Sequence, residues 1–183
     1  MLRSILLFVH VAGAMGVFVA LGMEALALAQ LKRASNVAGA RAGLAALGGS
    51  QRIVGPSGLL LVLSGIYLAT AYWQWQGAWM GLGFVGMITI GAVGGIMTGR
   101  NAGRLRKDLD ASRGSTASVT VPAVFWTSFA IRAALLVAVV FLMTVKPGPL
   151  GSLAALGLAV VTGLAVSRTG RRAEVALESG ARP

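Results

Sequence analysis

Three ionisable side chains lie inside long apolar stretches of the sequence, and they are the first candidates for chemistry. Glu24 and His10, the only histidine, belong to the first stretch, and Arg132 belongs to the fourth. Ionisable groups are costly to place inside a membrane, and they often mark ion paths, proton relays or ligand sites. A functional role is therefore sought first at these three residues.

Glu24 and Arg132 can reach each other if their stretches are neighbouring membrane helices. At a rise of about 1.5 Å per residue, the depths of the two residues differ by about 6 Å, which an arginine side chain can cover. Three interpretations are open: a structural ion pair between the helices, a charge site on an ion or proton path, or two side chains that reach the membrane surface independently.

His10 allows two readings, a hydrogen bond to a neighbouring helix or axial ligation of haem b, for which one imidazole suffices. It lies about 21 Å along the helix from Glu24, so the two cannot share a metal ion. Zinc and copper sites need several nitrogen or sulfur ligands. The chain has no cysteine, and its seven methionines are not clustered in sequence. We therefore predict no metal site made of side chains alone, and haem b remains the one cofactor considered.

Motifs for hydrolysis or phosphoryl transfer are not found. The glycines form no phosphate-binding loop, and neither a zinc-protease motif nor a serine–histidine–aspartate set can be assembled around His10. The absence of these motifs in the sequence favours a protein that is not an enzyme.

Five stretches are long and apolar enough to be transmembrane helices, which need about 20 residues. They cover residues 5–31, 53–73, 79–98, 121–145 and 150–166. They do not alternate between polar and apolar residues as the strands of a membrane barrel would. The predicted fold class is therefore all-α, a polytopic transmembrane helical bundle in one domain of residues 1–183.

The composition agrees with a membrane protein. Of the 183 residues, 56% are hydrophobic and 11% are charged. Such a chain is neither disordered nor, without cysteine, a disulfide-stapled domain. A cleaved signal peptide with a site near residues 11–14 is the alternative for the first stretch, but its apolar run exceeds that of a signal peptide. A retained helix is predicted.

The basic residues that give the chain its formal net charge of +11 lie mostly in alternate connections between the apolar stretches. The connections 32–52 and 99–120 and the tail after residue 166 hold thirteen of the sixteen basic residues. By the positive-inside rule, the N-terminus lies outside and the C-terminus in the cytoplasm of a bacterial inner membrane. The basic residues then meet anionic lipid at the inner leaflet, and nucleic acid is not expected as a partner.

The connections themselves are short. Segment 32–52 is expected to be a loop with a short amphipathic helix on the membrane surface, and segment 99–120 a loop whose residues 114–118 are flexible. Both are too small for a soluble domain. On the opposite side, aromatic residues flank the connection 74–78, as at a membrane interface, and residues 147–149 form a turn.

Small residues at four-residue spacing predict two close helix contacts. Ala12, Gly16 and Ala20 form one such stripe, for which we expect contact within the chain. The second stripe consists of Gly91, Gly95 and Gly99. Its partner could be a helix of the same chain or of another copy in a homo-oligomer.

The first two stretches resemble known families. Residues 7–14, LFVHVAGA, resemble the first helix of a loose group of small bacterial membrane proteins. The group comprises an uncharacterised integral-membrane family, the CopD-type copper-resistance proteins and the HemJ-type protoporphyrinogen oxidases. The second stretch, from Pro56 through GIYLA at residues 65–69 and on to Trp79, is similar to the uncharacterised family. The resemblance covers the first three stretches, roughly half the chain.

The resemblance implies haem at His10, because the first-helix histidine of HemJ-type proteins is associated with haem. The chain departs from that pattern because it has no second histidine to serve as the other axial ligand. The same shortage of ligands puts a CopD-like copper role in doubt.

Three functions remain open. The first is a structural or accessory protein, or a small permeation unit, without catalytic apparatus. The second is a haem-binding redox or porphyrin-related protein that uses His10. The third is a proton- or ion-coupled transporter that uses Glu24 and Arg132. Cofactor colour and ion flux in liposomes distinguish the three.

Overall fold

The computed structural model describes residues 1–111 and 122–178, with side chains up to residue 168. Every element in this part of the chain is helical. Two short π-helical segments, η1 and η2, interrupt the α-helices. The elements are α1 (Leu2–Arg33), α2 (Val37–Leu68), η1 (Ala69–Trp73), α3 (Ala78–Val93), η2 (Gly94–Gly99), α4 (Arg100–Ala111), α5 (Val124–Val145) and α6 (Pro149–Glu178).

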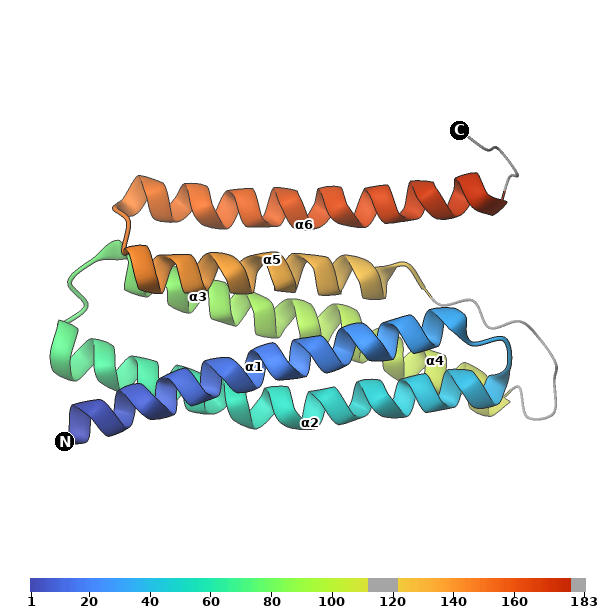
Figure 1. Cartoon of the computed structure of the whole chain (residues 1–183), viewed down its shortest axis with the longest axis horizontal. Coiled ribbons are helices and arrows are strands. Elements are labelled where there is room, and N and C mark those ends of the chain that lie inside the picture. Colours follow the sequence, from blue (N-terminus) through green and yellow to red (C-terminus); the bar gives the residue numbers. More distant parts are fainter. Residues whose placement is uncertain (112–121, 179–183) are drawn as a thin grey trace.

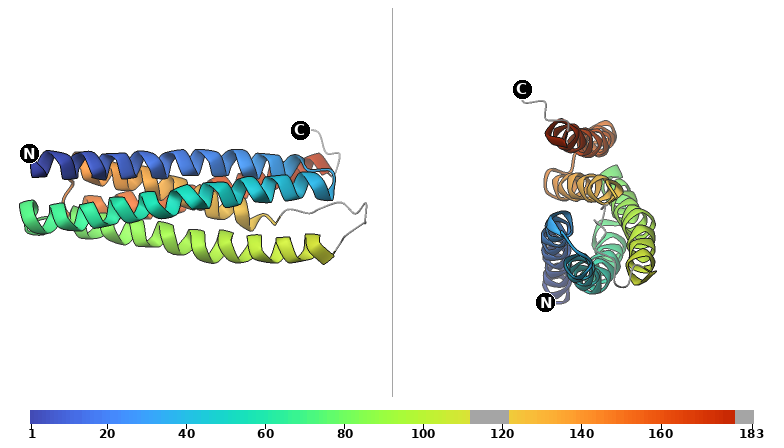
Figure 2. Two further views of the ribbon diagram at one scale, coloured as in Figure 1. Left: turned by 90° about the horizontal axis from the view of Figure 1, so that it is seen from below. Right: turned by 90° about the vertical axis from the view of Figure 1, so that its right-hand side faces the viewer.

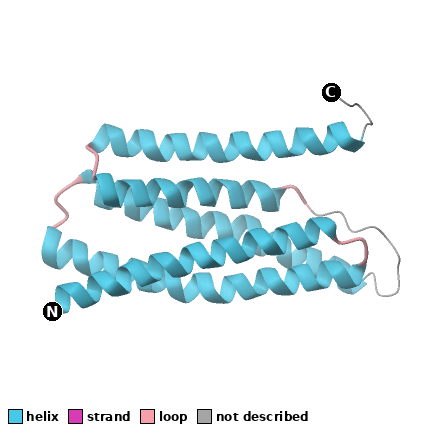
Figure 3. Ribbon diagram, in the orientation of Figure 1, coloured by secondary structure: helices cyan, strands magenta, loops and turns pink. Residues whose placement is uncertain are grey.

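The prediction of an all-α bundle with five spans is confirmed. Five helical rods are long and apolar enough to cross a membrane. Four of them contain a predicted span in full, whereas the fourth rod begins at Val124, three residues after the predicted start of its span at residue 121. Successive rods run in opposite directions (Figure 1). The same elements, coloured by type, show how little of the described chain lies in loops (Figure 3). The described chain is thus an all-helical bundle with five helices suited to span a membrane.

The bundle has two chemically different ends. We call one the aromatic end, where α1 begins, η1 and α3 meet, and α5 turns into α6; it carries Trp73, Trp79 and Lys146. The other is the basic end, where α1 ends, α2 begins and α4 lies. Figure 1 shows α1 starting at the first and α6 finishing at the second.

Segment 37–52, expected as a loop or surface helix, is instead the first half of α2. Asn36 caps this helix because its side-chain oxygen accepts a hydrogen bond from the Gly39 N–H at 2.8 Å. Ala40, Gly43 and Leu47 are buried. A Cβ added at Gly43 would lie 2.7 Å from Leu31 Cγ, so glycine permits a close approach of α1. This packing makes the segment helical, although its arginines had suggested a loop.

The other connection is also partly helical. Residues 100–111 form α4, whose Leu105 and Leu109 are buried while its charged residues point outward. Arg41 of α2 donates a hydrogen bond to the Leu109 carbonyl at 3.0 Å. Residues 114–118, expected to be flexible, lie outside the described residues.

These extensions make the bundle longer than a membrane is thick. From Val37 to Trp73 the chain is helical over 37 residues. This corresponds to about 55 Å, against about 30 Å for a bilayer core. The extension at the basic end has its own hydrophobic core, made of Ala27, Leu28, Leu31, Ala40, Leu47, Leu105, Leu109 and Phe125.

The second hydrophobic core lies further toward the aromatic end and is centred on α5. Leu135, Leu136 and Val139 are buried there with residues from each of the other long helices. An end-on view shows α5 between α6 and the remaining helices (Figure 2). Gly163 of α6 lies directly on α5, because a Cβ added there would be 2.6 Å from Ile131 Cα.

Candidate functional site

Arg132 and Glu24 meet in the middle of the bundle, at the point where α5 approaches α1. Arg132 Nη1 donates to Glu24 Oε2 at 2.9 Å, and Nη2 donates to Glu24 Oε1. The two residues are 3% and 2% exposed. Such a two-point contact between guanidinium and carboxylate is the strongest geometry for this pair. Of the three readings of these residues, the arrangement corresponds to an ion pair that joins two helices.

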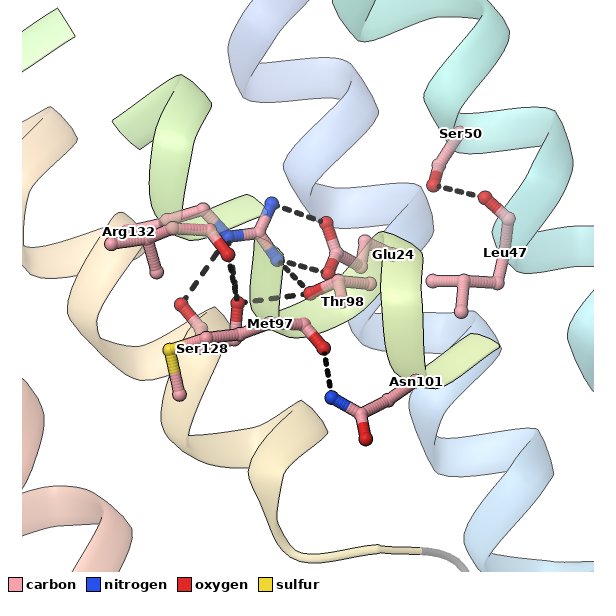
Figure 4. A network of polar contacts seen from close by, with 9 residues as sticks. Glu24, Leu47, Ser50, Met97, Thr98, Asn101, Ser128 and Arg132 are labelled. Atoms are coloured by element: carbon pink, nitrogen blue, oxygen red, sulfur yellow. Dashed lines mark hydrogen bonds and ion pairs between the residues drawn. The ribbon is translucent and has the colours of Figure 1, made fainter. Parts of the chain in front are cut away.

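Two hydroxyl groups complete the surroundings of Arg132 (Figure 4). Nη2 also donates to Thr98 Oγ1 at 3.1 Å, and Nε lies 3.3 Å from both the carbonyl and the hydroxyl oxygen of Ser128. The two hydroxyl oxygens are 2.9 Å apart. No buried side-chain nitrogen or oxygen among the described residues lacks a hydrogen-bond partner. We call Glu24, Thr98, Ser128 and Arg132 the ion-pair network.

The segment η2 brings Thr98 to this network. A π-helical turn changes the direction of side chains along a helix, and such turns are frequent at functional sites. Gly94, at the start of η2, faces the guanidinium: a Cβ there would lie 3.3 Å from Arg132 Nη1. Glycine therefore leaves the room that the arginine occupies. Asn101, one turn further on, instead donates to the Met97 carbonyl of its own helix.

His10 lies apart from this network, on α1 near the aromatic end. Its Nδ1 is 3.0 Å from the Leu61 carbonyl oxygen and 3.2 Å from Ser64 Oγ, both on α2. A carbonyl only accepts hydrogen bonds, so Nδ1 carries the hydrogen. In the neutral imidazole, Nε2 is then the nitrogen with a free lone pair, which is how protein histidines are commonly prepared for ligation. Both readings of His10 thus remain compatible with the geometry.

His10 also belongs to the wall of a cavity of about 550 Å³. The cavity lies between the aromatic-end halves of α1, α2, α3 and α5, with η1 at one side. Its wall is almost wholly apolar, and His10, Thr144 and Lys146 are the polar residues in it apart from the indole N–H groups. Such size and lining are typical of ligand sites.

The cavity opens sideways between α1 and α5. These helices are close at the ion-pair network and separate toward the aromatic end (Figure 1). The lining residues Val11 and Met15 of α1 are 53% and 65% exposed, and Val140 of α5 is 39% exposed. In a membrane these side chains face lipid, so this side of the cavity can be reached from the bilayer.

Lys146 lines the cavity at the aromatic end and is exposed. Its Nζ is 4.2 Å from the ring centre of Trp73 and 5.6 Å from that of Trp79. The two indoles pack edge to face. The Lys146 backbone is left-handed, with φ at 53°, and its N–H bonds the Leu142 carbonyl to end α5. A cation is thus fixed where the cavity meets the aromatic rings.

Four of the seven methionines line the same cavity. Met15 comes from α1, Met80 and Met87 from α3, and Met143 from α5. They are far apart in the sequence, so their spacing gave no signal of a shared site. Thioether and imidazole are a known ligand pair for haem iron. Among the described residues no group of three histidine, cysteine, aspartate or glutamate residues could hold a metal ion.

An apolar layer separates the cavity from the ion-pair network. Leu136, one helical turn after Arg132, is buried and forms part of the cavity wall, as does Val139. Glu24 and Arg132 do not line the cavity. The structure thus keeps His10 apart from the two charged residues.

The two stripes of small residues differ in their surroundings. Gly16 faces the Ser57 side chain of α2 and Ala20 is buried, whereas Ala12 is exposed. Gly91 and Gly95 have no atom within 4 Å of an added Cβ, and Gly99 is also exposed. The second stripe therefore lies on the outside of the bundle, away from the described helices.

Comparison with known proteins finds no matching family model, no similar curated protein and no similar solved structure. The resemblance to the CopD-type and HemJ-type group thus stays a prediction from the first two stretches.

Proposed function

We propose that the protein binds a small apolar molecule taken from the membrane, and that it does so without catalytic apparatus. The observation that carries this proposal is the apolar cavity of about 550 Å³ that opens between α1 and α5. Ligand sites of drug-sized molecules have volumes of about 300–1,000 Å³ and mostly apolar walls. Because the opening faces lipid, a membrane-soluble molecule can enter without crossing water.

The ion-pair network supports the same proposal because it joins α1 to α5, two of the helices that form the cavity. Both carboxylate oxygens of Glu24 are engaged by Arg132. A residue that carries a proton or an ion must release its partner during each cycle, and leaving either charge unpaired in the bundle is costly. The closed geometry favours a structural pair over the proton- or ion-coupled transporter.

Tryptophan fluorescence provides the test, because three of the four tryptophans, Trp73, Trp75 and Trp79, line the cavity. The bromine atoms of methyl 9,10-dibromostearate quench nearby indoles. We expect saturable quenching in the wild type and its loss in Ala14→Phe, which fills the cavity. Ala12→Phe, on the exposed side of the same helix, is the matched control and keeps the quenching. Quenching that never saturates, and is equal in all three proteins, contradicts the proposal.

Haem b is a second candidate ligand, and the geometry of His10 favours it. Nδ1 is held by Leu61, which leaves Nε2 to bind iron, and methionine thioethers line the same wall. Lys146 offers a cation for the haem carboxylates. These residues fit the group, which when bound would supply one-electron redox chemistry.

Absorbance spectra of the purified protein, oxidised and dithionite-reduced, test this candidate. Cells are grown with ample haem supply, and His10→Ala is measured beside the wild type. A Soret band that is lost in His10→Ala makes His10 a haem ligand. A colourless wild type excludes haem and leaves the apolar ligand.

The charge distribution supports one orientation in the membrane. Lys32, Arg33, Arg100, Arg104 and Arg168 lie toward the basic end, and we propose that this end is cytoplasmic and meets anionic lipid of a bacterial inner membrane. The end of α6 then lies in the cytoplasm. A reporter fused after Pro183 is expected to be active only in that compartment; a periplasmic signal would reverse the orientation.

A further inference from the structure

We infer that the ligand of the cavity is an amphiphilic acid, with its anionic group at Lys146 and its apolar body inside the bundle. This inference rests on the proposed function, since it names the chemistry of the molecule that the cavity takes. It follows from where the protein places its cations and its carboxylates.

Lys146 is the one cation among the residues that line the cavity, all of which belong to the described part of the chain. No aspartate or glutamate lines it. The five acidic residues of the chain are Glu24, Asp108, Asp110, Glu174 and Glu178. Glu24 is bound to Arg132, and the other four belong to α4 and to the final turns of α6, at the basic end. The aromatic end therefore offers the lysine no carboxylate.

The contacts of Lys146 are instead the faces of Trp73 and Trp79. A cation over an indole at an exposed position is held weakly, and its remaining N–H groups stay available to an acceptor. An anion bound there would approach the ammonium without displacing any protein carboxylate. The left-handed backbone of Lys146 and its N–H bond to Leu142 keep this position fixed.

The rest of the cavity determines the body of the ligand. Beyond Lys146 the wall continues through Met143, Val139 and Leu136 along α5, without a further charged group. A volume of about 550 Å³ suits one drug-sized molecule. A phospholipid with two acyl chains is larger than that. The chemistry points to a molecule with one apolar body and one acidic group.

The test compares 9,10-dibromostearate with its methyl ester, which has the same dibrominated chain but no charge on its head group. Binding is followed by tryptophan quenching in nanodiscs of zwitterionic lipid at pH 9, where the acid is ionised. We expect the wild type to bind the acid about fivefold more tightly than the ester, the factor of a pair at an exposed position. Lys146→Gln is expected to bind both equally, and Lys146→Arg to keep the preference.

Two features make the variants interpretable. Gln74 already adopts a left-handed backbone in this protein, with φ at 48°, so glutamine is compatible with the conformation of position 146. Arg3→Gln is the matched control: Arg3 is a cation at the same end that lies over Tyr72 and does not line the cavity. Its removal should leave the preference for the acid unchanged.

The outcomes separate the two proposals. Equal, saturable binding of acid and ester by the wild type overturns the inference and leaves the apolar site intact. Saturation by neither molecule overturns both. A preference that survives Lys146→Gln but falls in Arg3→Gln assigns the anion to another cation. If dibrominated phosphatidylcholine quenches the tryptophans as fully as the acid does, the cavity holds bulk lipid and the inference of a single-chain acid is wrong.

Discussion

The two halves of the bundle treat polar groups in opposite ways. Around Arg132, four residues from three elements satisfy one another, and no buried side-chain nitrogen or oxygen of the described residues is left without a partner. Around His10, one ring nitrogen is held by α2 and the other is left free, beside a cavity. The first arrangement suits a scaffold, and the second suits the ligand site proposed above. An intramembrane ionisable residue therefore indicates function only when its polar atoms are not all used within the protein.

Breaking the ion pair is expected to have the largest effect. Arg132→Gln or Glu24→Gln leaves the partner's charge buried, which costs about 3–5 kcal/mol of unfolding free energy. Thermal or denaturant unfolding in detergent measures it. The double variant should be less destabilised than the sum of the two single changes, because coupled residues are not additive. Strict additivity would show that the two side chains do not interact.

Removing one hydroxyl from the network is expected to have a smaller effect. Ser128→Ala deprives Arg132 Nε and Thr98 of a partner, with an expected cost of about 1–3 kcal/mol. Ser50→Ala is the matched control, since buried Ser50 only bonds the Leu47 carbonyl of its own helix. We expect the control to unfold closer to the wild type. Equal losses would mean that the network adds nothing beyond an ordinary buried hydroxyl.

Added side-chain volume should have opposite effects on stability in the two halves of the bundle. Ala14→Phe fills space, so its unfolding free energy should stay equal to that of the wild type or rise by about 1 kcal/mol. Gly94→Val adds atoms against Arg132, 3.3 Å from the position of the first added carbon, and should destabilise by about 1–3 kcal/mol. Unfolding of both variants under one condition compares the two halves directly. The contrast would fail if Ala14→Phe were the more damaging change.

The smallest effect on stability is expected on the outer face of α3. Gly95→Leu places its side chain in open space, so the unfolding free energy should change by about 0.5 kcal/mol or less. Its oligomeric state, measured by native mass spectrometry, should change only if the stripe of Gly91, Gly95 and Gly99 joins two copies. A large loss of monomer stability would show that the face is not open.

The sequence was sufficient for the helices and for the depth of the charged residues. Long apolar runs specify membrane helices with little dependence on tertiary context, and the rise per residue brings Glu24 and Arg132 to comparable depth. Ser128 also carries a signal in the sequence, because it lies four residues before Arg132, on the same helical face. Thr98 carried none, because η2 turns its side chain and nothing in the sequence predicted a π-helical segment there.

The cavity could not be predicted, because it arises from the separation of two helices rather than from a local pattern. Its methionines are distributed over three helices, and each looks like an ordinary packing residue in sequence. The extensions 37–52 and 100–111 are rich in arginine and glycine, which in the sequence predict a connection, with at most a short surface helix in the first, rather than a continuation of the bundle. Buried Leu47, Leu105 and Leu109 were the residues that could have indicated helical packing.

The overlength of α2 has a practical consequence. A compact membrane protein of 18.6 kDa ordinarily has little mass outside its detergent micelle, so its particle images are hard to align in cryo-electron microscopy. Here two antiparallel helices and α4 continue past the expected edge of the lipid with a packed interior of their own. An antibody fragment or designed binder raised against residues 37–52 would bind the packed first half of α2. The cavity proposed to hold the ligand, in the other half of the bundle, would stay accessible.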